Sequence, residues 1–225
     1  MSKITLLLVD DHGVVRYGLR ALLSNEPDFE IIGEATSGRE AIARAQELKP
    51  DIIVMDLAMP LLNGTEATRQ IIAGCPSAKI IVLSGYTDAE HVERVIAEGA
   101  AAYLLKHTAG DDLIRAIREV RNGNSFFSPA VASLLSAKRI SDLEHAKSTP
   151  PAPRLTMRES EVVQLIAEGF LTKQIADELK ISVKTIEKHR QSAMQKLNLH
   201  CIADLVRHAA ATGIIQAPSS RTILN

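Results

Sequence analysis

Residues 50–60 read PDIIVMDLAMP, and the fold of the N-terminal half can be worked out from this stretch. Residues 52–55 are apolar throughout and lie between two acids, Asp51 and Asp56. An apolar run of this length, without alternation, is typical of a strand covered on both faces, as in a parallel sheet flanked by helices. The carboxyl group of Asp56 is then expected at the carboxyl end of a buried strand.

Segments of the same kind alternate with helical patterns through residues 1–122. Val15, Leu19 and Leu22 follow the first apolar run at spacings of four and three residues, which is one helix face. Strands are predicted at residues 4–9, 31–35, 52–55, 79–83 and 102–105. A helix is predicted after each strand, the last three at about residues 65–73, 89–97 and 111–121. The pattern predicts an α/β, flavodoxin-like fold with a five-stranded parallel sheet and five helices.

The pattern changes after residue 122. Ser128 and Pro129 predict the start of a short helix that runs to about Arg139, and the Pro-rich segment Ser148–Pro153 predicts a stiff, extended linker. From there the chain has the pattern of a small all-α domain. We therefore expect a first domain at residues 1–122, a partly helical linker at 123–153, a four-helix domain at 154–215 and a tail at 216–225.

The four helices of the second domain are predicted from their start signals. Thr156 to Glu159 has the pattern of a capping box, and Thr172 and Ser182 are expected to cap the next two helices. A fourth helix is predicted over residues 202–212, with Gly213 after its end. The second and third helices, separated by a tight break at residues 180–181, form a helix-turn-helix pattern.

Composition places the chain among ordinary soluble globular proteins. Hydrophobic residues make up 46% of the 225 residues and charged residues 24%, which excludes disorder over most of the length. Aromatic residues make up only 3%, without Trp, so base-stacking platforms for single strands are not expected. Cys75 and Cys201 lie far apart and form no metal-binding pattern, so we expect both to be small buried residues.

Membrane insertion is not expected. The N-terminal apolar run is too short for a signal peptide and ends in two acids, and no apolar window has the length of a membrane span. A cytoplasmic location is the default expectation, and no membrane partner is predicted.

The net charge of −1 hides two parts of opposite sign. Residues 1–124 hold 13 Lys and Arg against 18 Asp and Glu, a net charge of −5. Residues 154–225 hold 10 against 7, a net charge of +3. A near-neutral total therefore does not exclude nucleic acid as a partner of the second domain.

Polar side chains follow the ends of the predicted strands. Asp10 and Asp11 follow the first strand, Asp56 the third, Ser84 ends the fourth and Lys106 follows the fifth. The carboxyl ends of parallel strands face one crevice, so these groups are expected to converge. Clustered carboxylates suit Mg²⁺, and an aspartate beside Mg²⁺ can accept a phosphoryl group as an acyl phosphate. The hydroxyl and the ammonium could then bind the phosphoryl oxygens.

These motifs together resemble the receiver domain of bacterial two-component response regulators. The residues that carry the resemblance are Val9-Asp10-Asp11, the stretch 50–60, Asn63-Gly64, Leu83-Ser84-Gly85 and Tyr103-Leu-Leu-Lys106. The resemblance covers about residues 3–121 and implies that Asp56 is the phosphoacceptor. It also implies that Mg²⁺ (or Mn²⁺) is bound by Asp11, Asp56 and the backbone carbonyl of Ala58, with Asp10 helping through a water molecule.

The resemblance also assigns a switch. It implies that Ser84 is the switch hydroxyl, that Lys106 is the phosphate-binding cation and that Tyr103 moves inward when Ser84 engages the phosphoryl group. Many members of the family have Pro after this lysine, whereas this chain has His107.

The predicted third helix of the second domain has an outward polar face. Lys184, Lys188, Gln191 and Gln195 follow each other at spacings of four, three and four residues, while Ile186 lies on the opposite, inward face. A polar face with net positive charge fits the major groove of DNA, where Lys and Gln can read base edges. Taken alone, the same face could also be an ordinary solvated one.

The whole segment resembles the LuxR-type helix-turn-helix of NarL/FixJ response regulators over about residues 154–215. The matching stretches are 155–161, 167–169, 173–176, 181–189 and 196–197. The resemblance implies a DNA-contacting surface that includes Lys184, with Glu187, Lys188 and Gln191 facing bases. It places Lys173, Thr185, His189 and Arg190 near phosphates.

Two of these positions have alternatives. Glu187 could accept a hydrogen bond from cytosine N4 or could merely pair with Lys184 or Lys188. His189 could contact phosphate or pack at the helix interface.

The resemblance implies a phosphorylation-controlled transcription factor. A sensor histidine kinase would phosphorylate Asp56, and the chain would then bind double-stranded DNA as a homodimer through the fourth helix and act with RNA polymerase. It would be no enzyme in the usual sense, but would promote its own Mg²⁺-dependent phosphorylation and dephosphorylation. A phosphatase of the haloacid dehalogenase type is the first alternative, but it requires an acid where Ala58 stands. A receiver that dimerises without phosphate is the second.

Overall fold

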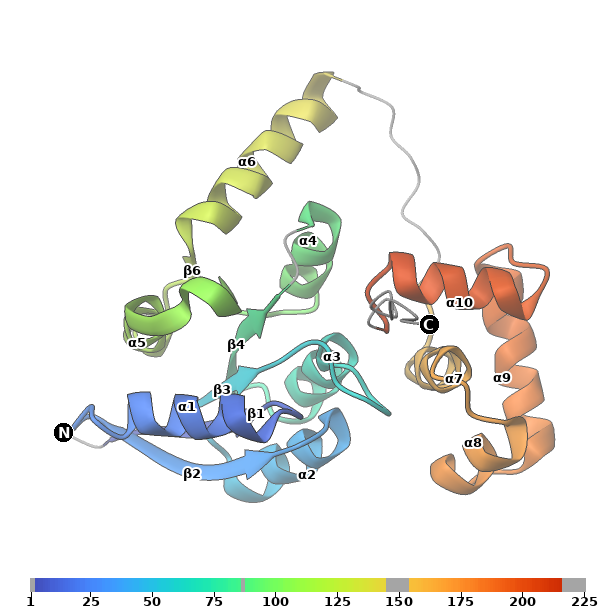
Figure 1. Ribbon diagram of the computed structural model, residues 1–225, viewed down its shortest axis with the longest axis horizontal. Helices are drawn as coiled ribbons and strands as arrows, with labels where there is room; N and C mark the ends of the chain where they lie inside the picture. The colour runs from blue at the N-terminus through green and yellow to red at the C-terminus, as the bar shows by residue number, and fades with distance from the viewer. Residues whose placement is uncertain (1–2, 86–87, 145–153, 216–225) are drawn as a thin grey trace, which may run out of the picture. The chain divides into compact units, whose positions relative to one another are not determined.

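The computed structural model describes residues 3–85, 88–144 and 154–215. The chain divides into two compact units, Met1–Thr149 and Pro150–Asn225 (Figure 1). The linker predicted at Ser148–Pro153 and the tail predicted at 216–225 lie outside the described residues. Within the described part, no helix combines the length and the apolar character needed to cross a membrane.

The first unit is built on one parallel sheet. Its described strands pair in the order β2-β1-β3-β4-β5-β6, and every neighbouring pair is parallel. The strands are β1 (Ile4–Val9), β2 (Phe29–Ala35), β3 (Ile52–Met55), β4 (Lys79–Ser84), β5 (Ala102–Leu105) and β6 (Phe126–Phe127). The predicted parallel α/β fold is confirmed.

The sixth strand is an addition to the five predicted from the sequence. Phe126 pairs with Ala102 and Phe127 pairs with Tyr103, so this short strand extends the sheet beyond β5. Two residues are too few to show a period in the sequence. The strand is defined by its hydrogen bonds to a neighbour, and those depend on tertiary structure.

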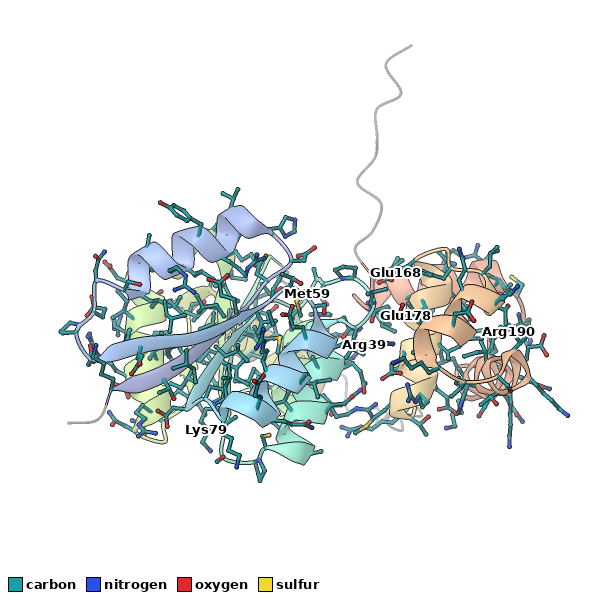
Figure 2. The ribbon with its side chains drawn as sticks, turned by 90° about the horizontal axis from the view of Figure 1, so that it is seen from below. Arg39, Met59, Lys79, Glu168, Glu178 and Arg190 are labelled. Atoms are coloured by element: carbon teal, nitrogen blue, oxygen red, sulfur yellow. The ribbon has the colours of Figure 1, made fainter. Side chains whose placement is uncertain are left out.

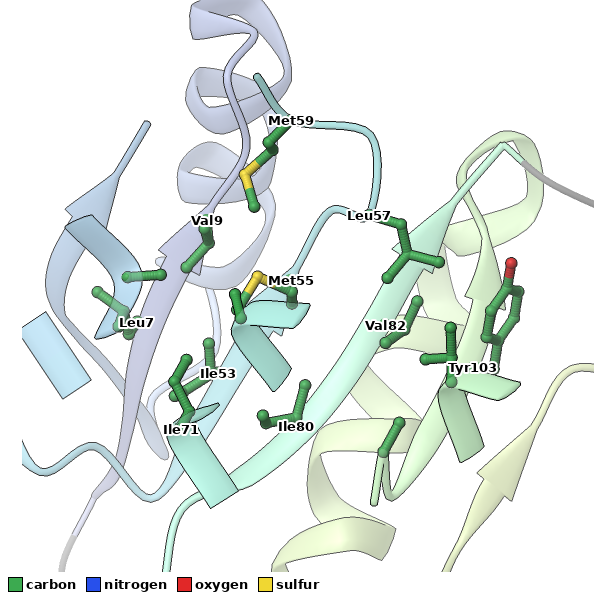
Figure 3. Close-up of a cluster of buried hydrophobic side chains, with 14 of the residues drawn as sticks. Leu7, Val9, Ile53, Met55, Leu57, Met59, Ile71, Ile80, Val82 and Tyr103 are labelled. Carbon is green, nitrogen blue, oxygen red and sulfur yellow. The ribbon is translucent and has the colours of Figure 1, made fainter. Parts of the chain in front are cut away.

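Helices cover both faces of the sheet. The helices of this unit are α1 (Gly13–Leu23), α2 (Gly38–Leu48), α3 (Gly64–Gly74), α4 (Ala89–Ala97), α5 (Ala109–Arg121) and α6 (Pro129–Glu144), with a short 3₁₀ helix, η1, at Lys106–Thr108. One core cluster lies between the sheet and α1 and α5. The other lies between the sheet and α2, α3, α4 and the start of α6, and Figure 3 shows part of it. The helix predicted to end at about Arg139 continues to Glu144.

Side-chain caps define where several helices begin. Ser37 accepts a hydrogen bond from the amide of Glu40 at the start of α2, and Asn63 does the same for Glu66 at the start of α3. Such caps satisfy backbone donors that have no partner inside the helix. They hold the loops after β2 and β3 in place, next to the carboxyl ends of these strands.

The second unit is a four-helix domain, as predicted. Its helices are α7 (Met157–Ala167), α8 (Thr172–Leu179), α9 (Val183–Lys196) and α10 (Ile202–Ala211). Lys180, between α8 and α9, has a φ of 54°, in the left-handed region that makes a tight turn possible. Val163, Ala193 and Leu205 are fully buried and join α7, α9 and α10 in one core.

The structure corrects one predicted helix cap. Leu171 rather than Thr172 precedes the first turn of α8, and Thr172 is the first helical residue. A Leu side chain offers no hydrogen-bond acceptor, so the cap depends on Gln174, whose Oε1 accepts a hydrogen bond from the amide of Leu171 at 2.8 Å.

The burial predicted for the cysteines is wrong for Cys201. Cys75 is half-buried and packs against the core, but Cys201 is exposed. Cys201 precedes the first turn of α10, and its thiol donates a hydrogen bond to Oδ2 of Asp204 at 3.1 Å. The thiol therefore has a polar partner at the surface, at the N-terminal end of α10, instead of a place in the core.

Candidate functional site

Two acids are buried where β1 and β3 end. The amide of Asp56 donates to the carbonyl oxygen of Val9 at 2.8 Å, and that of Asp10 donates to the carbonyl oxygen of Ala35 at 3.2 Å. The sheet pairing thus continues past the strand ends and fixes both backbones. The two residues are only 2% and 1% exposed, so each carboxylate needs a partner that compensates for lost hydration.

Lys106 supplies that partner. Its Nζ lies 2.8 Å from Oδ2 of Asp10 and 2.8 Å from Oδ2 of Asp56. Lys106 directly follows β5, so the parallel sheet brings it to the same edge as the two acids. The convergence predicted from the strand ends is present in the structure for Asp10, Asp56 and Lys106.

Burial and the charged partners shift the pKa values of Asp56 and Lys106 in opposite directions. Burial raises the pKa of Asp56, Lys106 opposes the rise, and the negative charge of Asp10 adds to it. Burial alone would lower the pKa of Lys106, but its hydrogen bonds to the two carboxylates outweigh this and raise that pKa. The ammonium therefore stays protonated at neutral pH and keeps Asp56 able to ionise.

The pocket has the donor set of a divalent cation site. Ligand atoms of Asp10, Asp11, His12 and Asp56 all lie within 4.8 Å of one another. Three carboxylates against one ammonium leave excess negative charge, and hard oxygen donors are those Mg²⁺ prefers. These residues fit the magnesium ion that the sequence predicts.

Two residues of this pocket were missed in the sequence. Nδ1 of His12 lies 2.8 Å from Oδ1 of Asp11, and Nη1 of Arg16 donates to the carbonyl oxygen of Asp10 at 2.7 Å. Nε of Arg16 also donates to Glu34 at 3.1 Å, which ties α1 to β2 beside the pocket. Their positions in the sequence could have indicated them, because His12 directly follows the paired acids and Arg16 lies one helical turn further.

The loop after β3 is held against Asp56 by the Asn63-Gly64 pair. The amide of Gly64 donates to the carbonyl oxygen of Leu57 at 2.9 Å. A Cβ atom at Gly64 would lie 2.0 Å from the carbonyl oxygen of Asp56, so only glycine fits. The amide of Ala58 faces Oδ1 of Asp56 at 3.4 Å. Figure 2 shows Met59 of this loop at the opposite end of the sheet from Lys79, which begins β4.

Ser84 and Tyr103 lie on neighbouring strands and share one face of the sheet. Tyr103 pairs in register with Val82, and Ser84 is two residues beyond Val82, so all three side chains point to the same side. Both Ser84 and Tyr103 are fully buried. The Tyr103 ring lies in the cluster of Figure 3, an inward position.

Helix α9 presents the polar face predicted from its sequence. Lys184, Glu187, Lys188 and Gln191 are exposed, while Thr185, His189 and Arg190 are half-buried and Ile186 is buried. Figure 2 shows Arg190 on this helical unit. Lys173 on α8 is exposed as well.

Glu159 joins the start of α7 to the C-terminal part of α9. Its two carboxylate oxygens accept hydrogen bonds from Ser192 Oγ and Lys196 Nζ, each at 2.7 Å. Burial alone would raise the pKa of Glu159, but these bonds and those from Thr156 lower it to about 2. The sequence marked Glu159 only as part of the capping box, because its partners in α9 are more than thirty positions away.

Comparisons with known proteins agree with both halves. A family model for the response regulator receiver domain matches residues 6–118, and one for bacterial regulatory proteins of the luxR family matches residues 153–209. The transcriptional regulatory protein LiaR of Bacillus subtilis is 42% identical over 87% of this chain and 92% of its own. The response regulator protein VraR of Staphylococcus aureus is 37% identical over 95% of this chain and 99% of its own.

Solved structures show the same two-part architecture. The response regulator RcsB of Salmonella typhimurium matches with a TM-score of 0.59 and 30% identity, over 94% of this chain and 100% of that one. A structure of an RcsB–DNA complex matches with a TM-score of 0.58 and 28% identity, over 93% and 99%. The chain therefore belongs to the NarL/FixJ family of bacterial two-component response regulators, which join a receiver domain to a LuxR-type DNA-binding domain. It is a regulator of transcription.

Proposed function

We propose that Asp56 accepts a phosphoryl group from a sensor histidine kinase and that this controls DNA binding by the C-terminal unit. The observation that carries the proposal is the pair of 2.8 Å contacts that join Lys106 to the buried carboxylates of Asp10 and Asp56. This pocket combines a nucleophile, a cation and an acidic metal site at one edge of the sheet. The receiver is then residues 1–122, and the segment 123–153, whose β6 and first turns of α6 pack on the receiver, joins it to a DNA-binding domain at 154–215 and a tail at 216–225.

The residues divide the chemistry of transfer among them. A carboxylate oxygen of Asp56 attacks the phosphorus, and the bond from phosphorus to the histidine nitrogen of the kinase breaks. Lys106 then pairs with a phosphoryl oxygen instead of the free carboxylate, and Ser84 donates a hydrogen bond to another. Mg²⁺ (or Mn²⁺), when bound by Asp11, Asp56 and the Ala58 carbonyl with Asp10 in support, supplies positive charge to the transferring group.

The same pocket accounts for both phosphorylation and dephosphorylation of Asp56. Because the groups that stabilise transfer belong to the receiver, it promotes its own phosphorylation and also hydrolysis of the acyl phosphate. Ala58 stands where a phosphatase of the haloacid dehalogenase type would carry its acid. A separate phosphatase activity is therefore not proposed.

The C-terminal unit is proposed to bind the major groove of double-stranded DNA through α9. Its exposed Lys184, Glu187, Lys188 and Gln191 offer both donors and an acceptor for base edges. Lys173, Thr185, His189 and Arg190 are assigned to phosphates. Structures of RcsB dimers on DNA support a homodimer as the bound form, which we place at α10. RNA polymerase is the further partner proposed.

The test is selection of binding sites from random DNA with and without acetyl phosphate, using the wild type and Asp56→Asn. The wild type should gain one phosphoryl group by intact mass and enrich a two-fold symmetric site. Asp56→Asn should gain neither mass nor stimulation. DNA binding by Asp56→Asn that is still stimulated by acetyl phosphate would contradict the proposal. A wild type that is dimeric both without and with beryllofluoride and Mg²⁺ would contradict it as well.

A further inference from the structure

Val183 is an exposed apolar side chain on the helix that is proposed to read DNA. It is the first residue of α9, a helix labelled in Figure 1, and it is 42% exposed. The other exposed side chains of this helix are all charged or amides: Lys184, Glu187, Lys188, Gln191 and Gln195. Single exposed apolar residues are common on protein surfaces, so it is the position of Val183 that sets it apart.

Val183 belongs to the row of side chains that the proposed function directs at base edges. Val183, Glu187 and Gln191 follow each other at spacings of four residues, so they lie along one side of α9. All three are exposed. In helix-turn-helix proteins, the N-terminal residues of the recognition helix contact base edges in the major groove. Val183 opens the row at this end of the helix and is therefore placed among the base-contacting residues.

The first turn of α9 holds the Val183 side chain in a defined direction. Oγ of Ser182 accepts a hydrogen bond from the amide of Thr185 at 3.1 Å and lies 2.8 Å from Oγ1 of Thr185. This cap fixes the backbone on both sides of Val183. Valine is branched at Cβ and has one strongly preferred rotamer in a helix, so its methyl groups lose little conformational entropy when they make a contact. The start of α9 thus offers a rigid apolar surface.

Thymine is the base that offers an apolar partner in the major groove. Guanine, adenine and cytosine present hydrogen-bond donors or acceptors there, whereas thymine carries a C5-methyl group beside its acceptor. The Val183 side chain can neither donate nor accept a hydrogen bond, so against any other base edge it would remove water from polar groups without pairing with them. The apolar side chain and the thymine methyl group are therefore matched in chemistry.

We infer that Val183 determines part of the DNA specificity by selecting thymine at one position of each half-site. The contact joins the Val183 methyl groups to the C5-methyl group of that thymine. The inference rests on the proposed function, in which α9 enters the major groove. It adds an apolar contact to the polar readout assigned to Glu187, Lys188 and Gln191.

The test replaces each thymine of the selected site in turn by deoxyuridine, which lacks only the C5-methyl group. Full-length protein with beryllofluoride and Mg²⁺ is titrated onto each DNA. For the wild type, we expect one thymine in each half-site whose replacement weakens binding about fourfold, the factor that corresponds to one buried methyl group. Val183→Ala should bind the unmodified site more weakly than the wild type and show no further loss when that thymine is replaced.

Met157→Ala is the matched control. Met157 is the first residue of α7 and follows the capping residue Thr156, as Val183 follows Ser182, and it is 38% exposed. Its truncation also removes exposed apolar surface at the start of a helix, but outside α9. Met157→Ala should keep both the affinity and the deoxyuridine profile of the wild type.

The salt dependence of binding supplies a second readout. An apolar contact releases no counterions, so Val183→Ala should keep the wild-type slope of log K against log salt. A smaller slope would mean that Val183 supports a phosphate contact, which would overturn the inference.

The remaining outcomes separate the inference from the proposed function. A wild type without a deoxyuridine-sensitive thymine would overturn the inference alone, and so would a sensitivity that Val183→Ala retains or that Met157→Ala loses. A wild type that selects no DNA sequence would overturn the proposed function and the inference with it.

Discussion

The ammonium nitrogen of Lys106, which follows β5, lies 2.8 Å from Oδ2 of Asp56, which follows β3, so the contact passes over the end of the intervening strand β4. It lies equally close to Asp10, so one cation serves two buried carboxylates. Asp11 adds a third carboxylate to the pocket. Lys106 and an added metal cation therefore neutralise the same cluster of negative charges. The affinity of the pocket for metal is therefore expected to depend on the Lys106 charge.

Replacement of Lys106 by Met should strengthen Mg²⁺ binding. The variant leaves three clustered carboxylates without their ammonium, and their mutual repulsion is relieved by a divalent cation. We expect a Mg²⁺ dissociation constant lowered by roughly tenfold, equivalent to about 1.4 kcal/mol, together with a large loss of phosphorylation by acetyl phosphate. Lys79→Met, an exposed lysine at the start of β4, is the control and should leave both unchanged. Weaker Mg²⁺ binding by Lys106→Met would contradict this account of the pocket.

Replacement of Gly64 by Ala should disturb the phosphoacceptor loop. The new methyl group would lie 2.0 Å from the carbonyl oxygen of Asp56, so the backbone must shift. Overpacking of this kind costs about 1–3 kcal/mol of the free energy of unfolding, measured by urea denaturation, and phosphorylation should slow as well. The control is Gly18→Ala in the exposed part of α1, where a Cβ meets nothing within 4 Å. Gly18→Ala should leave the free energy of unfolding unchanged or raise it. If Gly64→Ala were as stable as Gly18→Ala, the steric argument would be refuted.

The stability of the C-terminal unit should depend on pH through Glu159. Its pKa is lowered from 4.5 to about 2, so the folded state favours the ionised carboxylate. The stabilisation is complete above pH 4.5 and is lost as the pH falls toward 2, and it amounts to about 3 kcal/mol. Glu159→Gln should lose this amount at pH 7, and the difference from the wild type should shrink between pH 4.5 and 2.

The matched control for stability is Glu187→Gln on the exposed face of α9. It should unfold like the wild type throughout, when both are followed by urea denaturation at each pH. A difference between Glu159→Gln and the wild type that stays constant down to pH 2 would show that the ion pair with Lys196 is not its source.

Replacement of two lysines of the DNA-binding unit should change DNA binding in different ways. Lys173→Met is expected to weaken binding to all sequences alike and to reduce the slope of log K against log salt by about 1, because one phosphate contact is lost. Lys188→Met is expected to relax sequence preference at one position, by about 1–3 kcal/mol of discrimination. Binding isotherms over a salt series, on the selected site and on single-base variants, separate the two. Identical behaviour of both variants would undo the assignment of Lys188 to bases.

Strand ends were the part of the site that sequence could predict. The apolar run at residues 52–55 requires a buried strand, and Asp56 follows it directly, so its place at the sheet edge needs no knowledge of the other strands. Asp10, Ser84 and Lys106 follow from the same reasoning. His12 could have been found from its place directly after Asp11, with which it pairs. The contact of Arg16 with Glu34 and the α9 partners of Glu159 could not be predicted, since they depend on how helices lie on their neighbours.

The sequence by itself determined the elements, their order and the residue types at the strand ends. Periodicity and helix caps are local properties, which neighbouring residues along the chain define. Only the tertiary structure decided that Lys106 bridges two carboxylates, that β6 extends the sheet and that Val131 shares a core with Tyr103. These are contacts between distant parts of the chain, and their geometry depends on close packing of the whole domain.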